Sequence, residues 1–416
     1  MTHGTLQTAA RTAYACLAQS PIADLLKHMR RARGLKPLIA VHEDTPLASV
    51  LTTLRTANIL AVPVFRTPPH EPTGRLFTGI VSVFDILANT VFQAMFDNMA
   101  DSACVLSMDA PEFEKYMAVL EQEQAFFATK VGSLVGSTRE SSESWTLHSS
   151  DPLSSLLQML TSARYHRVLV IDDQALEASA RDAEDGFGPT APPSGSSIRL
   201  VTQTDLVRYL ADPAVRTALR PDAQDQASFD AALARIWSMP VSAAEELATQ
   251  RTPTNDMEAS RPLDAATGAP RKRVVTVRDT ATALAAMRTM HQHGVPAVAI
   301  VDATERLVAT LSASDLRGIT AASIETLINP VFEFLEAGRR SVGQLAADQM
   351  RTVSPTTTVE DAALQMLGAH IHRVWMVDDE DTPVGVLSFS DVLSLFVPES
   401  DPEPGVDAFA SAAVDA

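Results

Sequence analysis

The chain has 416 residues, of which 46% are hydrophobic and 5% aromatic, and its 33 basic and 51 acidic residues give a net charge of −18. This length allows two or three domains with buried cores. An acidic chain repels polyanions, so we expect neither nucleic acid nor a membrane among its partners. Two cysteines are too few for a disulfide framework or a zinc site, which indicates a reducing compartment.

The chain contains no apolar run long enough for a membrane helix. Its N-terminus also lacks the basic start and apolar stretch of a secretory signal. We therefore expect a cytoplasmic protein, with the nucleus as an additional location. The Thr- and Ala-rich start predicts an N-terminal helix, and an organelle transit peptide is the alternative.

A repeated unit begins with a short strand followed by a helix. In four places apolar residues recur at i, i+3, i+4 and i+7, which places them on one face of a helix. The four sets are Leu47, Val50, Leu51 and Leu54; Leu153, Leu156, Leu157 and Leu160; Ala283, Ala286, Met287 and Met290; Val359, Ala362, Ala363 and Met366.

A second strand follows each helix. The runs at 61–65, 167–172, 297–302 and 373–378 are continuous and rich in β-branched residues, as expected of strands buried on both faces. A third strand then ends in a hydroxyl residue placed three positions before an aspartate. The four pairs are Ser82 and Asp85, Thr202 and Asp205, Ser312 and Asp315, and Ser388 and Asp391.

The order strand, helix, strand, strand, helix predicts an α/β fold of the α+β type. One copy leaves an apolar sheet face uncovered, so copies should pair, and four copies make two pairs. We divide the chain into a helical N-terminal extension at 1–36, repeats at 37–100, 145–212, 271–322 and 345–397, helical connections at 101–144 and 323–344, a linker at 213–270, a disordered insert at 173–198 and an acidic disordered tail at 398–416.

The hydroxyl and aspartate pairs suit a nucleotide. An aspartate can accept hydrogen bonds from two ribose hydroxyls, while the hydroxyl residue and the free N–H groups of a helix start can contact phosphate. The same pattern is also an ordinary helix cap. Its recurrence at four equivalent places favours the nucleotide interpretation.

Cations occur where the helix gives way to the second strand in only two repeats. The second repeat has His166 and Arg167 and the fourth has His372 and Arg373, whereas the first and third repeats have uncharged residues. Arginine offers a planar fork that matches phosphate, and a protonated histidine adds a donor. The alternative is a pair of solvated cations. No catalytic or metal-binding motif occurs, so we predict a non-enzymatic protein without a metal.

The repeats resemble cystathionine-β-synthase (CBS) motifs, as the His-Arg strands and terminal S/T-x-x-D show. Four such motifs resemble two Bateman modules, and the whole chain resembles the gamma subunit of AMP-activated protein kinase and related fungal stress-response proteins. This resemblance implies two modules stacked into a disk, AMP, ADP or ATP as ligands without a further cofactor, and catalytic alpha and scaffold beta kinase subunits as partners.

The resemblance also assigns roles to residues. His166, Arg167, His372 and Arg373 would contact phosphate, and the four aspartates would hold ribose. Ser82, Thr202, Ser312 and Ser388 would be the hydroxyl contacts. The gamma family has arginines near the second strand of its odd repeats too, where this chain has Leu60-Ala61 and Pro296-Ala297.

Two functions therefore remain open. The first is an adenine-nucleotide-binding subunit that regulates a kinase of the AMP-activated, or SNF1, type. The alternative is a scaffold or phosphatase-regulating adaptor whose clefts are structural and whose partner surface is the insert at 173–198 or the basic run near 27–36.

Overall fold

A computed structural model provides the structure of the chain. The structure describes residues 3–34, 37–68, 75–89, 128–136, 146–161, 165–175, 197–218, 226–251, 274–317, 319, 326–341 and 351–398. Most of the predicted insert at 173–198, most of the connection at 101–144 and almost all of the tail at 398–416 lie outside these ranges. Within them, no helix is both long and apolar enough to cross a membrane.

Four sheets of three strands form the framework, one in each repeat. The first strand pairs parallel to the second, and the second pairs antiparallel to the third. In chain order the strands are β1 (Val41–His42), β2 (Ala61–Arg66), β3 (Leu76–Ser82), β4 (Thr146–His148), β5 (Arg167–Ile171), β6 (Ile198–Thr202), β7 (Thr276–Arg278), β8 (Ala297–Val301), β9 (Leu307–Ser312), β10 (Thr352–Val353), β11 (Arg373–Val377) and β12 (Pro383–Ser388).

Each repeat has one helix before its second strand and one after its third. The first group is α3 (Leu47–Thr56), α8 (Leu153–Thr161), α14 (Ala283–Gln292) and α16 (Val359–Gly368). The second group is α4 (Val83–Leu87), α10 (Gln203–Ala211), the 3-10 helix η4 (Ala313–Leu316) and α17 (Phe389–Ser394). All four predicted apolar stripes are buried, so the predicted mixed α/β fold is confirmed.

Further helices lie before the first repeat and in the segments that connect one repeat to the next. They are α1 (His3–Gln19), α2 (Ile22–Arg33), η2 (Val131–Leu134), α11 (Pro213–Ala218), α12 (Gln226–Trp237), α13 (Val241–Arg251) and α15 (Val331–Ser341). The sequence predicts a linker over 213–270, but α12 and α13 contribute buried residues to a core. The described parts of this range, 213–218 and 226–251, are therefore largely helical, and residues 219–225 and 252–270 lie outside the described residues.

The segment that leads into each repeat packs against the other repeat of its pair. Helix α2 precedes the first repeat but joins the second through the amide of Ile22, which donates to the carbonyl of Asp151 at 2.8 Å, and the amide of Leu153, which donates to that of Ser20 at 2.8 Å. The segment before the second repeat joins the first in the same way, through Val131 and Thr45.

The third and fourth repeats repeat this exchange. The amide of Val241 donates to the carbonyl of Thr357 at 2.8 Å, so α13 joins the fourth repeat, and the amide of Val331 donates to that of Ala281 at 3.0 Å, so α15 joins the third. Exchange of leading segments thus ties the first repeat to the second and the third to the fourth. The predicted pairing of four repeats as two modules is confirmed.

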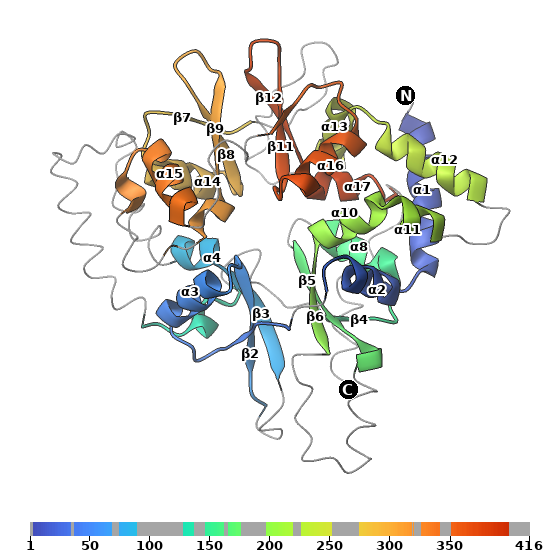
Figure 1. Cartoon of the computed structure of the whole chain (residues 1–416), viewed down its shortest axis with the longest axis horizontal. Coiled ribbons are helices and arrows are strands. Elements are labelled where there is room, and N and C mark those ends of the chain that lie inside the picture. The colour runs from blue at the N-terminus through green and yellow to red at the C-terminus, as the bar shows by residue number, and fades with distance from the viewer. Residues whose placement is uncertain are drawn as a thin grey trace.

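Two large cores run across these pairs. One combines the second and fourth repeats with α1, α2, α12 and α13, and the other combines the first and third repeats. Figure 1 shows the helices of the second and fourth repeats on one side of the molecule and those of the first and third on the other. Each repeat therefore contacts one neighbour through exchanged segments and another through its helices.

The exchange makes a prediction about Leu25, which is fully buried in α2 within the core of the second repeat. Replacing it with alanine leaves a cavity and should lower the free energy of unfolding by about 2–5 kcal/mol in urea titrations. Amide hydrogen exchange should then quicken in β5 and not in β2, although α2 is closer in sequence to β2 than to β5.

The matched control is Leu51→Ala, because Leu51 is buried in α3 of the first repeat. This variant should quicken exchange in β2. Faster exchange in β2 with Leu25→Ala, at an unchanged rate in β5, would contradict the packing described above.

Candidate functional site

The antiparallel register brings two sequence signatures together. In every repeat the hydroxyl residue at the end of the third strand pairs with the first residue of the second strand. Thr202 therefore lies opposite Arg167, and Ser388 lies opposite Arg373. In the first and third repeats the residue opposite is alanine.

Each aspartate of the S/T-x-x-D signature closes a capping box. The Oδ2 atom of Asp205 accepts hydrogen bonds from the amide of Thr202 at 3.0 Å and from its hydroxyl at 2.8 Å. Asp391 accepts the same two bonds from Ser388 at 2.8 and 2.7 Å. These carboxylates therefore start the helices α10 and α17 whether or not a ligand is present.

The first and third repeats contain the same box. Asp315 accepts bonds from the amide and hydroxyl of Ser312 at 2.7 and 2.8 Å. In the first repeat the amide of Ser82 donates to Asp85 at 2.7 Å, and the amide of Asp85 donates to the hydroxyl of Ser82 at 3.1 Å. The cap interpretation is thus correct for all four aspartates, and a ribose contact stays a prediction.

The carbonyls of both predicted histidines are fixed by the following helix. The amide of Gln203 donates to the carbonyl of His166 at 3.2 Å, and the amide of Phe389 donates to that of His372 at 3.2 Å. The ring of His372 also packs edge-on against Phe389, with 5.9 Å between ring centroids. Each His-Arg pair is therefore held beside the start of the helix that carries its aspartate.

The two His-Arg pairs lie close together, although their equivalent residues are 206 positions apart in sequence (372 − 166 = 206). Thr204 of the second repeat lies 3.4 Å from the Nδ1 atom of His372 in the fourth, measured from its Oγ1. Gln203 donates to the hydroxyl of Ser390 at 2.9 Å. Because α10 and α17 pack against each other, the His-Arg pairs of the second and fourth repeats meet at one place. With Arg317 of the third repeat they form what we call the cation cluster: His166, Arg167, His372, Arg373 and Arg317.

Desolvation and neighbouring positive charge lower the pKa of His372 to about 4, and the charges come from Arg373, Arg167, His166 and Arg317 in decreasing order of effect. The ring is in contact with solvent, yet protein groups surround it closely enough to weaken its hydration. His372 is therefore neutral near pH 7 in the free protein. A contact between an imidazolium form of His372 and a bound phosphate stays a prediction.

Arg317 and Gln203 are two members of this region that the sequence analysis missed. Arg317 follows the aspartate of the third repeat by two positions, where the other repeats carry aliphatic residues. That difference among aligned repeats was a usable signal. Gln203 follows Thr202 in the S/T-x-x-D signature. Only the fold shows that its side-chain Nε2 donates both to the carbonyl of Leu160 and to the hydroxyl of Ser390.

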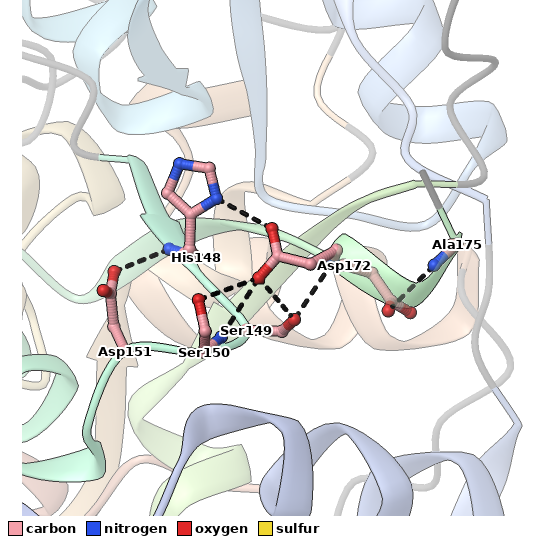
Figure 2. Close-up of polar contacts among 7 residues, drawn as sticks. His148, Ser149, Ser150, Asp151, Asp172 and Ala175 are labelled. Carbon is pink, nitrogen blue, oxygen red and sulfur yellow. Dashed lines mark hydrogen bonds and ion pairs between the residues drawn. The ribbon is translucent and has the colours of Figure 1, made fainter. Parts of the chain in front are cut away.

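The opposite end of the second sheet carries a different polar network, shown in Figure 2. The carboxylate of Asp173 accepts hydrogen bonds from the hydroxyls of Ser149 and Ser150, each at 3.0 Å, and lies 2.8 Å from Nδ1 of His148. Burial alone would raise the pKa of Asp173, but these hydrogen bonds outweigh it and hold the pKa below its usual value. The network fixes the turn after β4 to the residues that follow β5.

The equivalent place in the fourth repeat is hollow. A cavity of about 370 Å³ lies at the ends of β10 and β11, lined by Thr352, Val353, Ser354, Pro355, Val377, Asp378 and Asp379. It contains none of the predicted site residues. Among the described residues, no group of three or more histidine, cysteine or acidic side chains is placed to hold a metal ion.

Comparison with known proteins identifies the repeated unit. The family model of the CBS domain matches residues 32–90, 266–321 and 342–398, which correspond to the first, third and fourth repeats. The second repeat has the same strand order and the same capping box, so its likeness to the others rests on structure.

Two curated relatives come from Arabidopsis thaliana. The SNF1-related protein kinase regulatory subunit gamma-like PV42a is 23% identical over 378 residues, which cover 86% of this chain and 90% of the relative. The related PV42b is 22% identical over 418 residues, covering 92% of this chain and 96% of the relative.

Among solved structures, a protein of Methanocaldococcus jannaschii, described as a proposed archaeal homologue of g-AMPK, has 14% identity and a TM-score of 0.48. The similarity covers 87% of this chain and 97% of that one. The chain thus contains three regions that match the CBS domain, and over most of its length it is similar to gamma-like regulatory subunits of SNF1-related protein kinase.

Proposed function

We propose that this protein is a non-enzymatic regulatory subunit that binds AMP, ADP or ATP and controls a protein kinase of the AMP-activated, or SNF1, type. The observation that carries the proposal is the cation cluster. It gathers cationic groups from the second, third and fourth repeats around His372 in a chain whose net charge is −18. Guanidinium groups held near one another match the oxygens of a phosphate, so the cluster supports a phosphate-containing ligand.

The surrounding residues support a nucleotide as that anion. Arg167 and Arg373 each lie opposite the hydroxyl residue of a capping box, so a phosphate near the arginine would be close to a helix start. A carboxylate has about four acceptor positions, so the aspartate of the box can cap its helix and still accept a ribose hydroxyl. The phosphate contact would thus come from the start of one strand, and the ribose contact from the helix that follows the strand paired with it.

The kinase part of the proposal is supported by the relatives, which are described as gamma-like regulatory subunits of SNF1-related protein kinase and are matched over nearly their whole length. Regulation would follow from ligand-dependent packing at the contact between α10 and α17. A ligand shifts such a packing equilibrium only by the difference between its affinities for the two states.

The first test of this proposal is isothermal titration calorimetry of the full chain with AMP, ADP and ATP. Arg373→Ala should weaken binding of the preferred nucleotide by about 1.5–3 kcal/mol because it removes a charge-assisted hydrogen bond. Arg306→Ala is the matched control, since Arg306 is exposed in the loop before β9.

If no nucleotide binds saturably with a dissociation constant below about 1 mM, which corresponds to a binding free energy of about −4 kcal/mol, the proposal of nucleotide binding is overturned. Thermal melting without ligand separates a binding role from a structural one. If Arg373→Ala lowers the melting temperature sharply and leaves the affinity unchanged, the arginine serves the fold.

A second test concerns the pH dependence of His372. A bound phosphate offsets the repulsion from the neighbouring cations and raises the pKa of His372 above its free value of about 4. Affinity then increases as the pH falls through the window between the free and bound pKa values, and it is constant above the bound value.

The quantity to compare is the association constant of the wild type divided by that of His372→Gln. We expect this ratio to be constant between about pH 7 and 8 and to increase as the pH falls below about 6.5, the ordinary pKa of histidine. The ratio removes the titration of the phosphate itself. Calorimetry over this pH range provides the measurement, and a ratio that increases with pH would contradict the assignment.

A third test addresses the partner. Co-expression with the catalytic alpha and scaffold beta subunits of an AMP-activated or SNF1-type kinase should give a complex that elutes together in size-exclusion chromatography. Leu25→Ala, which weakens the second repeat, is expected to reduce the yield of that complex. Elution of the chain apart from both subunits, together with capture of a phosphatase, would favour the adaptor function instead.

A further inference from the structure

Arg317 is a basic residue that none of the repeated signatures includes. It directly follows η4, two residues after Asp315. The corresponding residues of the other repeats are Leu87, Val207 and Leu393, so the third repeat alone has a cation at this place. The third repeat also lacks the His-Arg pair of the second and fourth.

Two contacts between the third and fourth sheets fix where Arg317 lies. The indole Nε1 of Trp375 donates to the hydroxyl of Thr310 at 2.8 Å, in the middle of β11 and β9. Where β9 begins, the amide of Leu307 donates to the carbonyl of Asp381, which lies in the connection after the end of β11, at 3.0 Å. The two strands thus run in opposite directions past each other, so the end of β9 lies near the start of β11. Arg317 follows the end of β9, and Arg373 begins β11.

The guanidinium of Arg317 is only partly accessible to solvent. Its Nε is buried, and within the described ranges this atom has no hydrogen-bond partner. Burial lowers the pKa of Arg317, and the charge of Asp315 opposes that effect. The Oδ2 atom of Asp315 already accepts two bonds from Ser312. A buried N–H group without an acceptor is costly, so an incoming anion would relieve that cost.

The electrostatic surroundings agree with this placement. Positive charge from Arg317 acts on His372, together with that of His166, Arg167 and Arg373. Around His372 the second and fourth repeats contribute one arginine each, and the third contributes Arg317. The site thus contains three guanidinium groups whose charge does not depend on pH in the neutral range.

We propose that Arg317 contacts the terminal phosphates of a nucleoside di- or triphosphate and so favours ADP and ATP over AMP. The inference rests on the proposed nucleotide-binding function. ADP and ATP extend further from the ribose than AMP and have more negative charge, so a third arginine from a different repeat matches them better. Arg317 thereby supplies the third-repeat cation that Pro296 and Ala297 do not.

The experiment compares four full-length proteins by calorimetry: wild type, Arg317→Gln, Arg317→Lys and Arg306→Gln. Each is titrated with AMP, ADP and ATP, and its fold is checked by circular dichroism and melting. Arg317→Gln should weaken ATP binding about 10- to 100-fold, the loss typical of a charge-assisted hydrogen bond, and AMP binding less than about threefold. Arg317→Lys should show intermediate ATP affinity, and Arg306→Gln should equal wild type.

Equal ATP affinity of wild type and Arg317→Gln would overturn the inference and leave the proposed function standing. An equal loss for AMP and ATP would also overturn it, because Arg317 would then not distinguish terminal phosphates. If the wild type binds no nucleotide, the proposed function fails, and inorganic tripolyphosphate is the second probe. A thermal shift with tripolyphosphate that Arg317→Gln reduces would support the phosphate contact, and an equal or absent shift would overturn it.

Discussion

The antiparallel pairing of the second and third strands is the constraint on which the candidate site depends. In each sheet this register places the first residue of one strand opposite the last residue of the other. The capping box then follows without a gap, because the last residue of the third strand is also the N-cap of the next helix. Fixed positions on one strand pair thus bring an arginine, a hydroxyl and a carboxylate together in the second and fourth repeats.

Much of the fold could be predicted from local pattern. The apolar spacing of Leu153 and Leu156 defines a helix face by itself, and the run from Arg167 to Ile171 is typical of a strand buried on both faces. The four copies reinforced one another, which is why the second repeat was recognised although the family model does not match it. Periodicity within about 20 residues was sufficient for these elements.

The features that the sequence analysis missed depend on contacts distant in sequence. No local pattern shows that α2 leaves the first repeat to pack on the second, because its apolar face would fit either core. The same holds for Gln203, whose partner Ser390 is 187 residues away. The lowered pKa of His372 depends on burial and on charges from three repeats, which the residue type alone does not show.

The two sets of contacts between repeats have a consequence for how the protein can be divided. Exchanged leading segments join the first repeat to the second and the third to the fourth, whereas the shared cores join the first to the third and the second to the fourth. The four repeats therefore form a closed circuit of contacts, in which every cut passes through a buried interface. Separating the two halves would therefore expose buried apolar residues of both cores, and a disturbance in one repeat has two routes to the repeat diagonally opposite.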